Sequence, residues 1–295
     1  MSSPRDVSLG LAFGLAAALA WGAQAVVARS GALLGYSALD LVVLRYIAAG
    51  LALAPFAWRS RAVLARIGLK RLLVLAFAGG VGNALLFNGG VVYAPASHGG
   101  TIAPITSAVM GAVLGIPLLG EWPTRGRVVA LGVIVIGVLL IGIDGITGSV
   151  PGAWRGDLLL LATGTVWAAF TLLLRRWEVP ALAGNAAVCG LSALVVLPPW
   201  LLLGAGAVPD LPFRQALLQM VAQGLIASAL ATTLYARAVG LMGGTRTACL
   251  TALVPVVAVV LSVLVLNEPV SVTKLAGVVL AVGGMLVAVI FTGRR

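Results

Sequence analysis

Amide and aromatic side chains lie deep inside the long apolar runs of this chain, where polar atoms are costly unless they face protein, water or a ligand. Asn83 and Phe87, four residues apart, share one face of a helix. Amides bind an ammonium or a carboxylate without adding a formal charge, and an indole or phenol ring offers a flat apolar face with one polar atom. These types predict a site for a neutral, zwitterionic or partly apolar solute. The predicted substrate-binding residues are Trp21, Gln24, Asn83, Phe87, Trp167, Gln223 and Tyr235.

Packing is the alternative interpretation of the same side chains. Trp21 and Trp167 lie near the middle of their apolar runs, and both could fill the space between two helices. Most Ser and Thr hydroxyls in such runs bond a carbonyl one turn earlier. Amides are harder to account for in this way, and Gln219 and Gln223 again share a helix face. Both interpretations stay open for the aromatic rings.

Two basic side chains each admit two interpretations. Arg45 lies about one turn inside an apolar run, so it can extend to the outer membrane interface near Asp40, or act as a gate or carboxylate contact. His98 is the one histidine of the chain and precedes an apolar run. We expect it to be an exposed residue in an outward-facing link, with a proton-sensing gate as the alternative.

The acidic side chains lie at the ends of the apolar runs. Glu121 and Glu268 occupy equivalent places in two halves of the chain and are expected at opposite faces of the membrane, too far apart to share a substrate. Each, like Asp40 and Asp157, fits a role as a cap of free helix N–H groups. Since no acid is then left at membrane depth, a built-in proton relay has no obvious carrier, and both uniport down a gradient and coupling through less obvious groups stay open.

Catalytic, metal-binding and nucleotide-binding constellations are not found in the sequence. With one histidine and no deep pair of aspartates, neither a Ser/His nor a metal-dependent intramembrane enzyme is expected, and no cofactor is predicted. There is no G-x-x-x-x-G-K-[ST] sequence for ATP. A channel is the remaining alternative, although no ring-forming charges or carbonyl filter are evident. The pattern favours a carrier that is not an enzyme.

Composition places these residues in a membrane protein. Of 295 residues, 61% are hydrophobic and 9% are charged, whereas about a quarter of a soluble domain is charged. A spanning helix needs roughly 20 apolar residues, so the chain has room for about ten and for no separate soluble domain. The first run is too long for a signal-peptide core and is expected to be retained. The predicted spans are 8–28, 40–57, 71–93, 100–120, 127–143, 157–174, 181–203, 214–236, 244–266 and 272–292.

Basic residues orient the predicted spans. With both termini cytoplasmic, fourteen Lys and Arg residues fall on the inside and four on the outside, which satisfies the positive-inside rule. The net charge of +11 therefore indicates anionic lipid rather than nucleic acid as the partner. Cys189 and Cys249 lie in apolar runs and are expected to be free thiols.

An internal repeat divides the chain. Gly10 and Trp21 recur as Gly156 and Trp167 at an offset of 146 residues, and Gly99-Gly100-Thr101 recurs as Gly243-Gly244-Thr245 at an offset of 144. Each repeat holds five spans, and because five is odd the second repeat must enter the membrane inverted. The expected fold is therefore an all-α polytopic membrane protein with ten transmembrane helices as two inverted five-helix repeats, residues 1–147 and 148–295. Such repeats are typical of transporters with a central substrate site.

The order and duplication of these motifs resemble the EamA family of the drug/metabolite transporter superfamily. The resemblance is carried by the Trp early in each repeat, by Leu44-Arg45-Tyr46, and by the two helix ends Leu119-Gly120-Glu121 with Pro123 and Leu266-Asn267-Glu268 with Pro269. It covers essentially the whole chain. The chain departs from the family in its proline placement, with Pro104 and Pro117 in the fourth span and Pro255 in the ninth, and the seventh span lacks the Arg of the second.

The resemblance implies a secondary transporter of the inner cell membrane that exports small metabolites by alternating access. Amino acids, including aromatic ones, are the implied substrates, since the chain is most similar to the aromatic amino acid exporter branch. Another metabolite or a drug-like cation is the alternative cargo. The expected partners are the substrate and the lipid bilayer, and a monomer suffices.

Overall fold

The computed structural model describes residues 4–147, 150–203, 206, 208–210 and 212–292, and is helical throughout apart from short links. Its elements are, in order, α1 (Pro4–Leu33), α2 (Ala38–Arg59), α3 (Arg61–Ile67), α4 (Leu69–Ala76), the π-helical η1 (Phe77–Val81), α5 (Gly82–Tyr93), α6 (Ala96–Leu119), α7 (Arg125–Thr147), α8 (Ala153–Arg176), α9 (Ala181–Leu202), the 3₁₀ turn η2 (Val208–Asp210), α10 (Phe213–Gln219), the π-helical η3 (Met220–Leu230), α11 (Ala231–Met242), α12 (Gly244–Thr251), α13 (Leu253–Leu266) and α14 (Val272–Thr292).

All ten predicted spans are helical. Nine helical stretches of the described chain are long and apolar enough to cross a membrane, and a tenth, Val272–Ala288, is apolar but shorter. Two spans differ from simple α-helices because η1 interrupts the third and η3 the eighth. The link between the second and third predicted spans contains the additional short helix α3.

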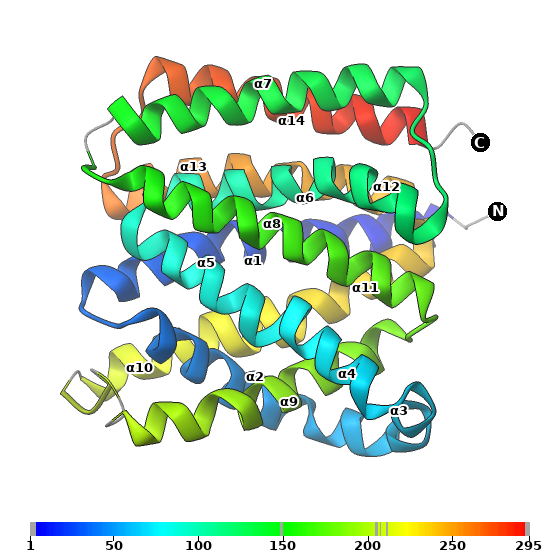
Figure 1. The fold of residues 1–295 in the computed structure, drawn as a ribbon, viewed down its shortest axis with the longest axis vertical. Coiled ribbons are helices and arrows are strands. Elements are labelled where there is room, and N and C mark those ends of the chain that lie inside the picture. The colour runs from blue at the N-terminus through cyan, green and yellow to red at the C-terminus, as the bar shows by residue number, and fades with distance from the viewer. Residues whose placement is uncertain (1–3, 148–149, 204–205, 207, 211, 293–295) are drawn as a thin grey trace.

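The helix packing follows the inverted repeat. Symmetry-related helices pack on each other in three places, α2 on α9, α6 on α13 and α7 on α14. Other contacts come in matched pairs: α6 with α8 corresponds to α13 with α1, and α5 with α8 corresponds to α11 with α1. Figure 1 shows α7 and α14 as an outer layer at one edge and α2 with α9 at the other. The ten-helix fold of two inverted repeats is confirmed.

The two ends of the bundle carry different residues. The start of α1, the end of α14 and α3 lie at one end, on the right of Figure 1. The end of α7, the start of α8 and the start of α6 lie at the opposite end. We call these the termini end and the His98 end. The basic residues of α3 thus lie at the same end as the two chain ends, as the charge count predicts.

Glycine creates equivalent irregularities in the two repeats. Gly80 in η1 and Gly224 in η3 are 144 residues apart, the repeat offset, and Gly80 has non-helical φ and ψ angles of −117° and −119°. A π-helical turn leaves backbone groups that need other partners. In η1, the hydroxyl of Ser192 accepts a hydrogen bond from the Val81 amide at 3.1 Å. In η3, Ser228 Oγ donates to the Gln223 carbonyl at 2.7 Å. Of the two π-helical segments, η1 packs against α9 and η3 packs against α2.

Close backbone contact between α7 and α14 predicts a difference between two glycines of one helix. A Cβ atom at Gly137 would lie 2.6 Å from the Gly277 carbonyl oxygen, whereas one at Gly132 would meet no atom within 4 Å. We expect Gly137→Ala to lower the thermal unfolding temperature in detergent by several degrees. The control Gly132→Ala should leave it unchanged or raise it, because alanine has the better helix propensity. Equal effects of the two would contradict the α7–α14 packing.

Candidate functional site

Trp21 of α1 contacts residues of η3 and α11. Its indole Nε1 donates to the Ala227 carbonyl at 3.1 Å, and its ring lies 5.2 Å from the ring of Tyr235 at an interplanar angle of 50°. Both side chains are half-buried. The indole N–H is thus satisfied by a carbonyl of the π-helical segment, and both rings keep some exposed surface. Gln24 is half-buried on the same helix, three residues after Trp21.

A chain of amide hydrogen bonds ends in an unpaired acceptor. Gln219 Nε2 donates to the Val27 carbonyl at 3.0 Å, which leaves Gln219 Oε1 to accept from Gln223 Nε2 at 2.7 Å. Both glutamines are fully buried. Because the Val27 carbonyl can only accept, Gln219 must donate to it with its Nε2, and Gln223 must in turn donate to Gln219 Oε1. The last atom of this row of hydrogen bonds is therefore Gln223 Oε1. This oxygen has no hydrogen-bond partner among the described residues. A buried acceptor of this kind is suited to a ligand that donates, such as an ammonium group.

Arg45 lies in the same region and contacts Ser228 of η3. Its Nε donates to Ser228 Oγ at 2.7 Å, and Asn185 Nδ2 donates to the Ser228 carbonyl at 3.0 Å. The π-helical segment thus presents a hydroxyl to Arg45, a partner that neither interpretation of the sequence had included. Asp40 itself caps α2 in a capping box with Ser37, as predicted.

A second group of predicted residues lies between α5 and α8. Asn83 is buried, and its Nδ2 donates to the Thr163 carbonyl at 3.0 Å. Trp167 lies against Phe170 with ring centroids 5.1 Å apart. Phe87 is half-buried and packs against the largest hydrophobic cluster. Among the described residues, no hydrogen bond or ring contact joins this group to that of Trp21, Gln223 and Tyr235.

His98 forms a charged cluster that the sequence analysis missed. It lies in α6 and is completely buried, so the expected exposed link position is wrong. Its Nδ1 lies 2.7 Å from Asp157 Oδ1, and its Nε2 lies 3.1 Å from Asp144 Oδ2. Asp157 does not cap α8 as predicted, because that helix begins four residues earlier and Asp157 is held by His98 instead. Two buried carboxylates and an imidazole therefore meet at a position for which the sequence analysis gave a proton-sensing gate only as the alternative.

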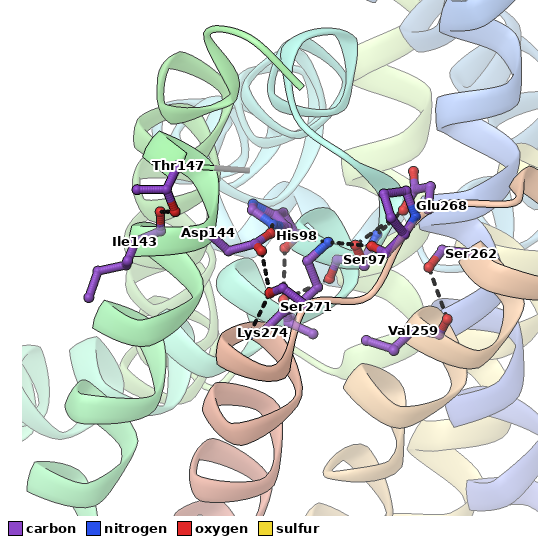
Figure 2. Close-up of polar contacts among 12 residues, drawn as sticks. Ser97, His98, Ile143, Asp144, Thr147, Val259, Ser262, Glu268, Ser271 and Lys274 are labelled. Atoms are coloured by element: carbon purple, nitrogen blue, oxygen red, sulfur yellow. Dashed lines mark hydrogen bonds and ion pairs between the residues drawn. The ribbon is translucent and has the colours of Figure 1, made fainter. Parts of the chain in front are cut away.

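Lys274 and Ser271 complete this cluster from α14 and the link before it. Lys274 Nζ lies 3.2 Å from Asp144 Oδ2 and donates to the Pro269 carbonyl at 3.1 Å. The Ser271 hydroxyl donates to Asp144 Oδ1. Figure 2 shows these side chains turned toward one another between α7 and α14. A cleft of about 220 Å³ borders the cluster, and its lining includes His98, Asp144, Ala153, Glu268, Ser271 and Lys274.

The two glutamates at the helix ends differ in their partners. Glu268 accepts hydrogen bonds from the Ala96 and Ser97 amides at 2.6 and 3.1 Å, so it caps α6 and not the helix that follows it. Glu121 forms an exposed ion pair with Arg175 at 2.7 Å. Since α6 separates the two glutamates by 24 residues, they lie roughly 36 Å apart along that helix. Their predicted separation is confirmed.

Local sequence offered one weak signal for the His98 cluster. Asp144 follows an apolar run that the structure shows to continue to Thr147, and Lys274 lies near the start of another. Neither residue belongs to a recognisable motif with another charged residue. His98 is 46 residues from Asp144 and 59 residues from Asp157 along the chain. Only the packing of α6, α7, α8 and α14 brings them together.

Known proteins agree with this architecture. The model of the EamA-like transporter family matches residues 8–143 and again residues 154–290. A solved structure, titled only as the crystal structure of a protein, is 21% identical; the match covers 97% of this chain and 98% of that one, with a TM-score of 0.62. That likeness shows the fold alone. No curated protein matches the chain. Because two copies of the family model cover nearly all of its length, the chain belongs to the EamA-like transporter family, whose members are membrane transporters of small substrates.

Proposed function

We propose that this transporter exports amino acids, including aromatic ones, as in the aromatic amino acid exporter branch, and that it does so by alternating access. The observation that carries the proposal is the buried acceptor Gln223 Oε1, which lies on η3 four residues before Ala227, the partner of Trp21. An ammonium group can donate to that oxygen while an aromatic side chain packs on the Trp21–Tyr235 pair. Neither contact requires a fixed charge in the binding site.

The second group of residues supports a site between the repeats. Asn83 and Phe87 belong to the first repeat, 1–147, and Trp167 to the second, 148–295. We propose that the two repeats move against each other about this site, with Gln24 and the α5–α8 residues lining the path. The charge distribution supports an inner-membrane location with the termini end in the cytoplasm and the His98 end outside.

Counterflow into proteoliposomes tests this function. Vesicles loaded with unlabelled L-phenylalanine should take up labelled L-phenylalanine with saturable kinetics, and less of a nucleotide sugar. We expect Trp21→Ala to reduce the preference for L-phenylalanine over L-serine by about tenfold, because a ring–ring contact and its buried area are lost. Trp58→Ala is the control, since that exposed ring lies at the end of α2.

Three outcomes would contradict the proposal. Uptake that never saturates, together with ohmic conductance, would indicate a channel. Transport of a nucleotide sugar with no response to any amino acid would refute the substrate class. An unchanged preference in Trp21→Ala would show that this ring only packs between helices.

A further inference from the structure

The contacts of His98 require one more proton than a neutral histidine and two ionised aspartates carry. A neutral imidazole has one N–H and one bare nitrogen, and an ionised carboxylate only accepts. Yet both ring nitrogens lie within hydrogen-bond distance of a carboxylate oxygen, at 2.7 and 3.1 Å. Both contacts are attractive only when an extra proton is present, as on an imidazolium ring that donates to Asp144 and Asp157. The arrangement therefore is a site for a proton.

The charges around the ring favour this occupancy. With the proton bound, His98 and Lys274 balance Asp144 and Asp157, whereas without it the buried cluster has one excess negative charge. Asp157 depends on His98 most strongly, because its Oδ1 contacts His98 while its Oδ2 is buried and has no hydrogen-bond partner among the described residues. An unpaired buried carboxylate is unfavourable.

Other charged groups near the cluster are already engaged. Glu268 binds the first amides of α6, as described above. Arg29 of α1 lies within electrostatic reach of Glu268 and donates to the Val91 and Val92 carbonyls at 2.8 and 2.7 Å. None of these groups supplies the missing proton between His98 and the aspartates.

The proton connects elements of both repeats at one end only. His98 and Asp144 come from α6 and α7, while Asp157 and Lys274 come from α8 and α14. With the offset of 144 residues that relates Gly99 to Gly243, His98 corresponds to Met242. With the offset of 146 residues that relates Gly10 to Gly156, Asp157 corresponds to Leu11. Met242 is buried beside Gly10, so the equivalent contact at the termini end is apolar.

We propose that His98, Asp144 and Asp157 form a proton-binding latch that is complete only while the His98 end is closed. This inference rests on the proposed alternating access. In this proposal, opening that end separates His98 from the carboxylates, and the proton then leaves through the adjoining cleft to the water on the same side. Since the closed state binds the proton more tightly, acid on that side favours closure. For one released proton, each pH unit shifts the ratio of closed to open states by up to about tenfold.

Nitrogen-15 NMR of the single histidine tests the proton site directly. The protein, labelled at histidine and freed of any histidine tag, is placed in nanodiscs and titrated between about pH 5 and 8.5. Two protonated ring nitrogens are expected in the closed state, and one of the two protons should be lost on raising the pH. A ring that keeps one bare nitrogen throughout this range would overturn the proposal, whatever the protein transports.

Thiol accessibility tests the latch without a substrate. Ala153, a buried residue of the cleft, is replaced by cysteine in a Cys189→Ser, Cys249→Ser background. The rate at which this cysteine reacts with a membrane-impermeant maleimide is measured. It is divided by the rate for a cysteine placed at the exposed neighbouring position, Trp154. This ratio, which cancels the pH dependence of the thiol itself, should fall by up to about tenfold per unit of acidification. With His98→Gln it should be high and independent of pH, whereas Glu121→Gln, at the opposite end, should behave as the parent.

The results separate the latch from the transport function. Equal pH dependence with and without His98→Gln, or no pH dependence in the parent, would overturn the latch. Failure of counterflow for every amino acid would refute the proposed function, while the NMR titration and the accessibility ratio would still decide whether His98 holds a proton that closes this end.

Discussion

Asp144→Leu is expected to lower the free energy of unfolding by about 3–5 kcal/mol, the usual effect of removing one partner from a buried ion pair. Asp144 binds His98, Lys274 and Ser271 at once. Without it, Lys274 is left 3% exposed with no carboxylate, and His98 loses one of its two anchors. The leucine replaces part of the lost volume, so the effect reports the unpaired charge and not a cavity.

Reversible unfolding in mixed micelles with increasing dodecyl sulfate measures this effect. The double variant Asp144→Leu, Lys274→Leu removes both charges and should recover most of the loss, since an apolar pair can replace a buried ion pair. Glu121→Leu with Arg175→Leu is the matched control, and because that pair is exposed it should change stability by about 1 kcal/mol or less. A single variant as stable as the parent would show that the cluster does not hold α7 against α14.

Gln223→Leu is expected to weaken L-phenylalanine binding by about 10- to 100-fold. A hydrogen bond to a charged group contributes about 1.5–3 kcal/mol, and each 1.4 kcal/mol corresponds to a factor of ten. Leucine has a similar volume but no acceptor, so the ammonium group of the substrate loses the partner that Gln223 Oε1 provides. The loss should appear in the affinity measured by counterflow and should be smaller for 3-phenylpropanol as a competitor, because that molecule has no ammonium group.

A glutamine outside the amide chain is the control for this variant. Gln215 is half-buried in α10, four residues before Gln219, and Gln215→Leu should leave the affinity unchanged. If Gln223→Leu and Gln215→Leu bind L-phenylalanine equally well, the unpaired oxygen is not a substrate contact. An equal loss for L-phenylalanine and 3-phenylpropanol would instead indicate a change of site shape.

Several local features were predictable because they depend on neighbouring residues. The ten spans follow from the length of the apolar runs, and the capping box of Ser37 and Asp40 follows from residues three apart. The face shared by Gln219 and Gln223 follows from helical spacing, and the structure confirms it with a direct hydrogen bond. The free state of Cys189 and Cys249 is confirmed as well.

The features that the sequence did not indicate depend on contacts between residues far apart in the chain. Arg45 meets a hydroxyl 183 residues away on η3, and the amide of Val81 meets Ser192 across 111 residues. The π-helical geometry of η1 and η3 was not expected, although glycines lie at equivalent places in both repeats. Hydropathy and helical periodicity report which residues face the lipid, and they do not report which polar groups meet inside the bundle.

The sequence by itself determined that this protein is a ten-helix membrane protein with two inverted repeats, because hydrophobic length and an odd number of spans per repeat leave no other solution. Only the tertiary structure decided that His98, Asp144 and Asp157 share a site, and that the amide chain of Gln219 and Gln223 ends in a free acceptor. The physical reason is that burial of a charge depends on partners from other helices. A histidine near a predicted loop is expected to be exposed when only its sequence neighbours are known, because the helices that bury it come from other parts of the sequence.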